Sequence, residues 1–331
     1  MSLPDRMQVV AISAPGGPDV LQPAERPVPQ PGAGEVLIKV AAAGVNGPDL
    51  MQRKGLYPAP PGASDLPGLE VSGEVVAKGP GAERWSVGDR VTALTNGGGY
   101  AEYCPVDARH CLPLPRRLSD VEAASLPETF FTVWSNIFIG AALASGETLL
   151  VHGGAGGIGT TAIQLGKAFG AKVIATDSPD ERCRICRELG ADRVIDYRAE
   201  DFVEIVRTEG GANVILDIVG GPNIERNFRA ASHDARIVQL AFPAGSKVEV
   251  NLMPVMLKRL TYTGSTLRTR PPAYKTRVAQ ELEARVWPLI GEGRIKPVVR
   301  ATFDLREAAR AHALMESSGH VGKIVLTVGK A

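Results

Sequence analysis

The stretch LLVHGGAGGIG, from Leu149 to Gly159, joins a short apolar run to a glycine-rich turn. The apolar run predicts a buried strand, and the residues that follow the turn predict a helix. In such a unit Gly154 permits a tight turn, Gly156 lets the backbone approach a pyrophosphate, and Gly159 lets helix and strand pack closely. Free N–H groups at the helix start then meet the phosphates. The stretch therefore predicts a dinucleotide-binding turn, made of Gly154, Ala155, Gly156, Gly157, Ile158 and Gly159.

Asp177 ends the next apolar run, 23 residues after Gly154. A carboxylate at this place accepts hydrogen bonds from the adenosine ribose, and it repels the 2′-phosphate of NADPH. Arg182, in the helix that follows, instead suits that phosphate. Asp177 is nearer the strand end, so the sequence favours NADH slightly and leaves dual use open. Asp177 as a turn residue before Ser178 and Pro179, and Arg182 as a solvated helix residue, are alternatives that also stay open.

Similar apolar runs and helical segments alternate along the middle of the chain. This alternation is typical of a parallel sheet that is covered on both faces. Six strands complete a doubly wound α/β sheet of the Rossmann type. The predicted strands are Leu149–His152, Lys172–Asp177, Arg193–Tyr197, Val214–Val219, Ile237–Leu240 and Leu260–Thr266, and the predicted helices include Gly157–Phe169 and Asp180–Leu189.

The two ends of the chain differ from this middle part. The first third predicts a β-rich unit, with short apolar runs separated by turns rich in proline and glycine. In the tail, the sequence predicts helices at Tyr274–Ile290 and Leu305–Glu316 and a strand at Val321–Val328. These elements are additional to the six strands of the sheet and the helices that connect them. We therefore expect the tail to return to the first domain. The predicted segments are 1–122 for the first part of the β-rich domain, 123–270 for the dinucleotide-binding domain and 271–331 for the returning part.

Composition and charge exclude several classes of protein. The 331 residues include 37 Lys and Arg against 36 Asp and Glu, and this net charge of +1 gives no general attraction to nucleic acid or to an anionic membrane. The first residues predict no secretory signal, because no apolar run follows their charges. The uncharged stretches 129–146 and 148–166 contain polar residues and many glycines, so we expect buried globular segments rather than membrane spans.

Cysteines and histidines indicate a reducing compartment and no metal. Four cysteines in a chain of this length do not make a disulfide scaffold, so we expect a cytoplasmic protein. Cys183 and Cys186 share one face of a predicted helix and are expected to face the core, with a redox pair as the alternative. None of the five histidines belongs to an HExxH motif or a Cys/His cluster, and His152 is expected in the core.

A series of further motifs follows one order along the chain: Gly44–Asn46, Gly68–Gly73, Val87–Val91, the glycine turn, Leu189–Asp192, Ile195–Tyr197 and Gly322–Leu326. This order resembles the medium-chain dehydrogenase/reductase family across nearly the whole chain. The resemblance implies an N-terminal GroES-like domain, a Rossmann domain and hydride transfer with a nicotinamide cofactor.

In the zinc alcohol dehydrogenases of that family, a cysteine at the place of Asn46 and a histidine at the place of Leu69 bind the catalytic zinc. The chain has neither ligand, so it resembles the zinc-independent quinone oxidoreductase branch. Within this branch, the chain resembles the tumour-suppressor-inducible quinone oxidoreductases in the segments Asp49–Arg53, Tyr57, Pro60–Ala63 and Gly97–Gly99. Members of that group that use NADPH tend to have Gly-Ser and a nearby Lys where this chain has Asp177, Ser178 and Arg182. Their cofactor preference therefore does not transfer to this chain.

The resemblance and the strand ends together imply the site residues. By family position, Asn46, Tyr57 and Thr132 are the candidate donors for negative charge that grows on an acceptor oxygen. Tyr197 is placed beside the adenosine, and residues that end the fourth to sixth strands face the nicotinamide half. For Phe242, packing is favoured over substrate contact. The cofactor residues beyond the glycine turn are Asp177, Ser178, Arg182, Tyr197, Val219, Gly220, Phe242, Ser265, Thr266, Leu267 and Lys323.

The leading hypothesis is an NAD(P)H-dependent quinone reductase that acts on a small molecule without zinc. A reductase of alkenal or enoyl double bonds uses the same hydride donor and stays open. A nicotinamide-binding protein that has lost catalysis also stays open. The resemblance further implies a homodimer through the edge of the sixth strand, and no nucleic-acid or membrane partner is expected.

Overall fold

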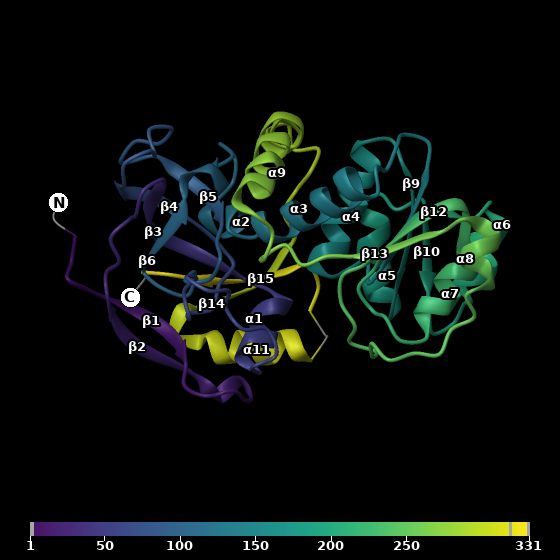
Figure 1. Cartoon of the computed structure of the whole chain (residues 1–331), viewed down its shortest axis with the longest axis horizontal. Helices are drawn as coiled ribbons and strands as arrows, with labels where there is room; N and C mark the ends of the chain where they lie inside the picture. Colours follow the sequence, from purple (N-terminus) through teal and green to yellow (C-terminus); the bar gives the residue numbers. More distant parts are fainter. Residues whose placement is uncertain (1–2, 318–319, 330–331) are drawn as a thin grey trace. The chain divides into compact units, whose positions relative to one another are not determined.

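The structure is a computed structural model that describes residues 3–317 and 320–329 (Figure 1). Parts of the predicted segments 1–122 and 271–331 therefore lie outside the described residues. The chain divides into two compact units. The first comprises Met1–Phe131 and Arg268–Ala331, and the second comprises Thr132–Leu267. Both ends of the chain thus belong to the first unit.

The second unit is built on a parallel six-stranded sheet in the order β10-β9-β8-β11-β12-β13. Counted along the chain, this is the order 3-2-1-4-5-6 of a Rossmann fold, so the predicted fold class is confirmed. Every strand predicted for this sheet is present; most ends shift by one or two residues, but the fifth strand begins six residues before the predicted Ile237. The strands are β8 (Thr148–His152), β9 (Lys172–Asp177), β10 (Arg193–Asp196), β11 (Ala212–Asp217), β12 (Ala231–Gln239) and β13 (Thr261–Gly264).

Helices cover this sheet and bury its strands. One core residue from each of five neighbouring strands is fully buried: Leu150, Ile174, Ile195, Ile215 and Ile237. Strands buried on both faces appear in sequence as nearly continuous apolar runs, which is why the sequence located them. The helices of this unit are the π-helical turn η3 (Trp134–Gly140), α4 (Gly157–Ala168), α5 (Asp180–Glu188), α6 (Phe202–Thr208), α7 (Asn223–Ala230) and α8 (Met253–Lys258).

The first unit contains a seven-stranded sheet, in which β14-β15-β3-β4-β5-β7 form one path and β6 pairs with β3. A separate antiparallel pair, β1 and β2, completes its strands. Leu326 of β15 lies opposite Ala43 of β3, so β15, near the end of the described chain, joins the sheet of the first unit. The strands are β1 (Arg6–Ile12), β2 (Leu21–Pro27), β3 (Glu35–Val45), β4 (Glu70–Lys78), β5 (Arg90–Leu94), β6 (Tyr103–Asp107), β7 (Cys111–Pro113), β14 (Val299–Asp304) and β15 (Lys323–Thr327).

The helices of the first unit depart from prediction at one place. The stretch Tyr274–Ile290 forms two helices rather than one, because Pro288 has no N–H to continue the hydrogen-bond ladder. In the described part of the chain, no helix is long and apolar enough to cross a membrane. The helices are η1 (Pro18–Val20), α1 (Gly47–Arg53), η2 (Ala108–His110), α2 (Asp120–Ala123), α3 (Pro127–Val133), α9 (Pro272–Arg285), α10 (Trp287–Gly291), η4 (Leu305–Glu307) and α11 (Ala308–Glu316).

The unit boundaries differ from the predicted ones, at 122 and 270. Ser72 Oγ on β4 donates to the carbonyl oxygen of Asp120 at 2.7 Å, and Thr92 Oγ1 on β5 donates to that of Ala123 at 2.7 Å. These bonds hold α2 on the sheet of the first unit, so the boundary falls later, within α3. Arg268 also belongs to the first unit, where its guanidinium is bonded.

The surface of the second unit has an unpaired strand edge. All four residues of β13, at the end of the sheet, are exposed. The preceding helix, α8, also has exposed apolar side chains, among them Met253, Met256 and Leu257 at 54%, 65% and 61%. An open edge with an apolar helix is typical of a surface that another chain covers.

Candidate active site

Two glycines of the turn between β8 and α4 are required by packing within the protein itself. A Cβ atom on Gly159 would lie 2.2 Å from the carbonyl oxygen of Gly153, and one on Gly154 would lie 2.7 Å from Sγ of Cys186. Gly156 differs, because the nearest atom to a Cβ there, beyond its immediate neighbours, is the Gly153 oxygen at 3.5 Å. The fold therefore leaves space at Gly156, as the approach of a pyrophosphate requires.

The start of α4 presents backbone donors that no side chain caps. Gly156 is the N-cap residue and has no side chain to accept a hydrogen bond from the first turn. The N–H groups of Gly157, Ile158 and Gly159 therefore lack helical partners, and the helix dipole also favours an anion at this end. This donor set fits the pyrophosphate of a dinucleotide.

Asp177 and Arg182, which are predicted to favour NADH and NADPH respectively, form an ion pair. Arg182 Nε donates to Asp177 Oδ1 at 2.6 Å, and Nη2 donates to Oδ2 at 3.3 Å. The backbone N–H groups of Ala155 and Ser178 donate to Oδ2 and Oδ1, at 2.7 and 2.8 Å. The carboxylate is thus buried with its acceptor positions occupied. A ribose that bonds to Asp177 must therefore replace the hydrogen bonds from Arg182, and the guanidinium group is then released from the carboxylate.

Ser178 and Tyr197 lie beside this ion pair. Ser178 Oγ is buried and has no hydrogen-bond partner within 3.5 Å among the described residues, although it is near enough to Asp196 to help lower the pKa of that carboxyl group. Buried hydroxyl groups are normally bonded, so this one suits an oxygen atom of a bound ribose or phosphate. The Tyr197 N–H donates to the carbonyl oxygen of Asp177 at 3.3 Å, and its side chain is half exposed. Both placements are compatible with the predicted adenosine site, which stays a prediction.

A buried polar network supports the loop after β11. The N–H groups of Val219 and Gly220 both donate to Asp217 Oδ1, at 2.6 and 2.9 Å. Asp217 Oδ2 accepts from Asn227 Nδ2 at 2.7 Å, and Asn227 Oδ1 bonds to His152 Nε2 at 2.8 Å. His152 is therefore a core histidine, as predicted. The network fixes the backbone that is predicted to contact the nicotinamide half.

The remaining predicted cofactor residues follow β12 and β13. Phe242 is 44% exposed, and a Cβ on Gly220 would lie 2.8 Å from its ring. Ser265 Oγ donates to Asn136 Oδ1 at 2.7 Å, which ties the end of β13 to η3. Thr266 is exposed and Leu267 is buried. These residues belong to the second unit, and their contact with a cofactor stays a prediction.

In the first unit, a buried ion pair lies beside Asn46. Lys323 Nζ on β15 is 2.6 Å from Glu70 Oε1 on β4, and the two side chains are 5% and 0% exposed. Asn46 Nδ2 donates to Glu70 Oε1 at 2.9 Å, and Asn46 Oδ1 accepts from Lys323 Nζ. Gly44 gives this carboxylate its room, since a Cβ there would lie 1.9 Å from Oε1. The ammonium group of Lys323, predicted at the cofactor site, is thus engaged within the first unit.

These residues do not fit the catalytic zinc of the zinc alcohol dehydrogenases. Leu69 is buried and has no donor atom, and the Asn46 amide is bonded to Glu70 and Lys323. Within residues 3–317 and 320–329, no three His, Cys, Asp or Glu side chains form a group that could hold a metal ion. We therefore derive no catalytic step through a metal.

Two more carboxyl groups lie near the ion pair. Asp49 Oδ1 accepts from the Gly68 N–H at 2.8 Å and Oδ2 from the Asn46 N–H at 2.9 Å, while burial raises the pKa of Asp49 to about 6. The Glu128 N–H donates to Glu70 Oε2 at 2.8 Å. Burial, followed by the charge of Glu70, raises the pKa of the Glu128 carboxyl to about 8. The cluster therefore contains an acid that keeps its proton at neutral pH.

Tyr57 lies beside Arg268, a buried cation that is close to a second buried cation, Lys275. The guanidinium carbon of Arg268 is 5.7 Å from the centre of the Tyr57 ring, and Nη2 donates to the carbonyl oxygen of Asn96 at 2.7 Å. Lys275 Nζ donates to Asn96 Oδ1 at 2.6 Å and to the carbonyl oxygen of Arg268 at 2.8 Å. Burial, then the charge of Glu128, raises the pKa of Tyr57, so the hydroxyl keeps its proton and can donate a hydrogen bond.

Thr132, the third predicted donor, lies in α3 and is the first residue of the second unit. Its carbonyl oxygen accepts from Ser135 Oγ at 3.1 Å and from Asn136 Nδ2 at 2.8 Å. Asn46 and Tyr57 belong to the first unit. The role of all three as donors to an acceptor stays a prediction.

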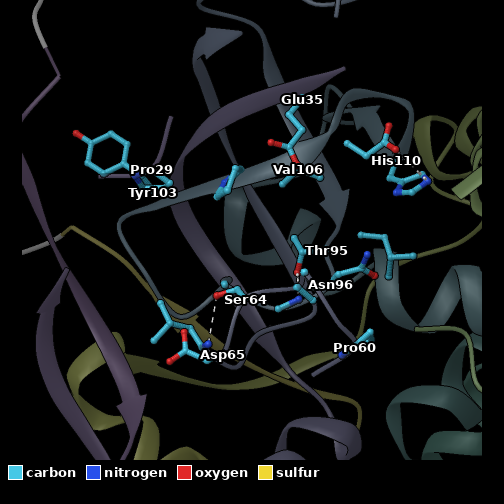
Figure 2. A pocket seen from close by; sticks show the side chains of 18 of the residues that line it. Pro29, Glu35, Pro60, Ser64, Asp65, Thr95, Asn96, Tyr103, Val106 and His110 are labelled. Atoms are coloured by element: carbon cyan, nitrogen blue, oxygen red, sulfur yellow. Dashed lines mark hydrogen bonds and ion pairs between the residues drawn. The ribbon is translucent and has the colours of Figure 1, made fainter. Parts of the chain in front are cut away.

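The first unit also contains a cavity of about 610 Å³. Figure 2 shows Ser64 and Asp65 on one side of it, Glu35 and Val106 on the opposite side, and Asn96 between them. None of the predicted site residues lines this cavity. It borders the cationic pair at Asn96, which bonds to both cations, and at Gly97, which lies next to the Arg268 guanidinium.

The chain matches two protein families, the alcohol dehydrogenase GroES-like domain over residues 32–116 and the zinc-binding dehydrogenases over residues 157–284. It is 31% identical to a human protein described as quinone oxidoreductase, over 97% of both chains. The chain belongs to the quinone oxidoreductase-like branch of the medium-chain dehydrogenase/reductase superfamily. Its predicted resemblance is thus confirmed, and membership of this superfamily makes it a nicotinamide-dependent oxidoreductase.

Solved structures of the superfamily show the same fold. An NAD-dependent alcohol dehydrogenase is 32% identical, covers 98% of this chain and 100% of its own, and has a TM-score of 0.87. The mycobacterial protein Rv1454c, solved with NADPH, is 31% identical over 97% of this chain and 100% of its own, with a TM-score of 0.86. The CurK enoyl reductase is 26% identical over 98% and 100%, also with a TM-score of 0.86.

Sequence reasoning missed several members of the site. Glu70 lies in a recognised motif, but its pairing with Lys323 connects distant parts of the chain. Glu128 did have a signal, because it is the only charged residue between Glu122 and Glu147. A single acid in a long uncharged stretch is expensive to bury, which is a mark of function. The cationic pair of Arg268 and Lys275, by contrast, has no local signal.

Proposed function

We propose that the chain is an NAD(P)H-dependent quinone reductase that works without a metal. The observation that supports this most is that Asn46 and Leu69 stand where the family resemblance places two zinc ligands, and the Asn46 amide is bonded to Glu70 and Lys323. Without a metal to polarise a carbonyl, the acceptor must itself be electron-poor, as quinones are. The human relative described as quinone oxidoreductase supports the same substrate class.

The second unit is proposed to hold the cofactor, which supplies a hydride from C4 of its nicotinamide. The uncapped start of α4 binds the pyrophosphate, and Asp177 binds the adenosine ribose. The loop after β11, held by Asp217, positions the nicotinamide half. Holding both reactants in place lowers the barrier by several kcal/mol, on the order of what oriented reactions gain. We propose NADH as the slightly preferred cofactor because Asp177 ends β9.

The first unit is proposed to stabilise the oxygen of the acceptor. Tyr57 offers a protonated hydroxyl, and Arg268 above its ring adds positive charge. Asn46 is fixed by Glu70 and Lys323 and has a second amide N–H for an acceptor. Thr132 is proposed as a further donor. Preorganised donors of this kind stabilise negative charge as it develops.

The proposal is tested by anaerobic oxidation of NADH and NADPH, followed separately by absorbance with an ortho-quinone as acceptor. We expect quinone-dependent oxidation that a metal chelator leaves unchanged. Activity that is lost with the chelator and restored by zinc would refute the metal-free mechanism. Cofactor binding without turnover of any acceptor would instead indicate a binding protein.

A second function, reduction of an enoyl double bond, is favoured by the likeness to the CurK enoyl reductase. The same donor would then deliver hydride to a β-carbon rather than to a quinone. An α,β-unsaturated aldehyde in the same assay separates the two functions. Turnover of the aldehyde far above that of the ortho-quinone would favour the double-bond reductase.

We also propose a homodimer in the cytoplasm. The exposed edge of β13 and the apolar side chains of α8 support an interface between two copies. The four cysteines are free, which suits a reducing compartment.

A further inference from the structure

The carboxyl group of Glu128 differs in its surroundings from the charged groups near it. Among the described residues, it makes neither a hydrogen bond nor an ion pair, whereas Glu70 is bonded to Asn46 and Lys323. Asp49 accepts two backbone N–H groups. Glu128 as a residue is only partly buried. A half-buried acid left unpaired in a cluster of satisfied groups is typical of a functional position.

The charges that face Glu128 come from five parts of the first unit. Glu70 on β4 and Asp49 on α1 disfavour its ionisation, and Lys323 on β15 and Lys275 on α9 favour it. The ammonium of Lys323 is already paired with Glu70, and that of Lys275 is bonded to Asn96, so neither neutralises Glu128 directly. Arg268 and Tyr57 also interact with it electrostatically. Burial dominates this balance, which keeps the proton on Glu128 at neutral pH.

Reduction of a quinone requires a proton as well as a hydride. The hydride brings two electrons and one hydrogen to the quinone, and the product at this stage is a hydroquinone anion. Its oxygen must gain a proton to give the neutral hydroquinone. Tyr57 can hydrogen-bond to this oxygen, but its raised pKa makes it a poor source of the proton itself. A nearby group that is a stronger acid than Tyr57 is a better source of this proton.

We propose that Glu128 is the catalytic proton donor of the reduction, which rests on the proposed reductase function. The O–H bond of the Glu128 carboxyl breaks, its proton forms a new O–H bond on the hydroquinone oxygen, and Glu128 remains as a carboxylate. Water then returns a proton to the carboxylate before the next turnover. Glu128 thus acts beside Tyr57, which orients the same oxygen.

The first test measures the ionisation of Glu128 without any substrate. In protein labelled with ¹³C at the glutamate carboxyl carbon, the signal missing from Glu128→Gln belongs to Glu128. We expect this signal to titrate with a midpoint near pH 8 in wild type. A midpoint in the range of ordinary glutamates, about 4.3, would overturn the proposal. Glu74→Gln is the control, because Glu74 is an exposed glutamate on the same strand as Glu70.

The second test compares pH profiles of kcat/KM with an ortho-quinone. We expect wild-type activity to fall as pH rises through about 8, because Glu128 then loses its proton. Glu128→Gln is expected to lose about 10²- to 10⁴-fold and to lack this alkaline decline. Lys275, whose pKa burial lowers to about 8, titrates in the same range, so the decline must disappear in Glu128→Gln to be assigned to Glu128.

Failure of this proposal is distinct from failure of the reductase function. An active wild type with an equally active Glu128→Gln variant overturns the role of Glu128 alone. A wild type that reduces no quinone overturns the reductase function, and with it the proton step. Glu128→Asp keeps a carboxylic acid at this position, so we expect it to be more active than Glu128→Gln and to show the alkaline decline. If Glu128→Asp is as inactive as Glu128→Gln, proton donation is contradicted.

Discussion

Replacement of Asp177 by asparagine is expected to move the cofactor preference toward NADPH. The asparagine keeps one oxygen to accept from the N–H of Ala155 or Ser178, but it has no charge to repel a 2′-phosphate. It also breaks the ion pair with Arg182, so the guanidinium becomes available to that phosphate. The ribose hydroxyls of NADH lose a charged acceptor at the same time.

The size of the shift follows from the contacts that change. A hydrogen bond to a charged group contributes about 1.5–3 kcal/mol, and about 1.4 kcal/mol corresponds to a tenfold change in affinity. One such bond is gained by NADPH at Arg182, whose side chain is 17% exposed and therefore partly screened. We expect the ratio of kcat/KM for NADPH to that for NADH to rise about 10- to 100-fold.

Initial rates with each cofactor give this ratio, and titration of cofactor fluorescence gives the ratio of affinities without turnover. Asp180→Asn is the matched control, since Asp180 begins α5 and its side chain is 80% exposed in a pair with Arg187. The control is expected to leave both ratios unchanged. Equal ratios in wild type and Asp177→Asn would remove Asp177 from the ribose site and refute the reasoning.

Three other variants test the structure around the site. Folding raises the pKa of the Glu128 carboxyl group from 4.5 to about 8, so wild type loses stability as pH rises between these two values. In calorimetry, Glu128→Gln is therefore expected to be more stable than wild type above pH 8 and about as stable as wild type below pH 4. Lys323→Met leaves Glu70 as a buried charge without its cation, so it is expected to lower the free energy of unfolding in urea by about 3–5 kcal/mol. Adding Glu70→Gln to this variant is expected to restore part of the loss. An unchanged urea midpoint in Lys323→Met would contradict the buried pair. Met256→Glu places a charge on the exposed apolar face of α8 and is expected to convert a dimer to monomer in sedimentation velocity, whereas a monomeric wild type would refute the interface.

The second unit was predictable from sequence because its signals are local. Each strand of the parallel sheet is an apolar run, and the turn before α4 has its own glycine pattern. In the first unit, the sequence analysis did not predict β1, β2, β6, β7 and β14. Strands with one exposed face, such as β1 and β2, have a weaker apolar pattern than buried ones, and β7 has only three residues. Pro288 is visible in the sequence and indicates where the helix divides, but the helical periodicity of the surrounding residues favoured a single helix.

The site was predictable only where family position or a local motif marked it. Asp177 and Arg182 were both identified, but their pairing depends on side-chain geometry that spacing does not give. The pair of Glu70 and Lys323 joins β4 to β15, so only the folded sheet brings the two charges together. Tyr57 was named as a donor, whereas Arg268 above its ring arrives with the tail of the chain.

The central claim is that this chain transfers a hydride from a bound nicotinamide to a quinone. Its most direct test is a single turnover, with enzyme in excess, of NADH that carries deuterium on one or the other face of C4. We predict that an ortho-quinone oxidises the bound cofactor and that only one of the two labels slows the reaction, because a fixed cofactor presents one face. Absence of oxidation, or a rate that neither label changes, would contradict direct hydride transfer.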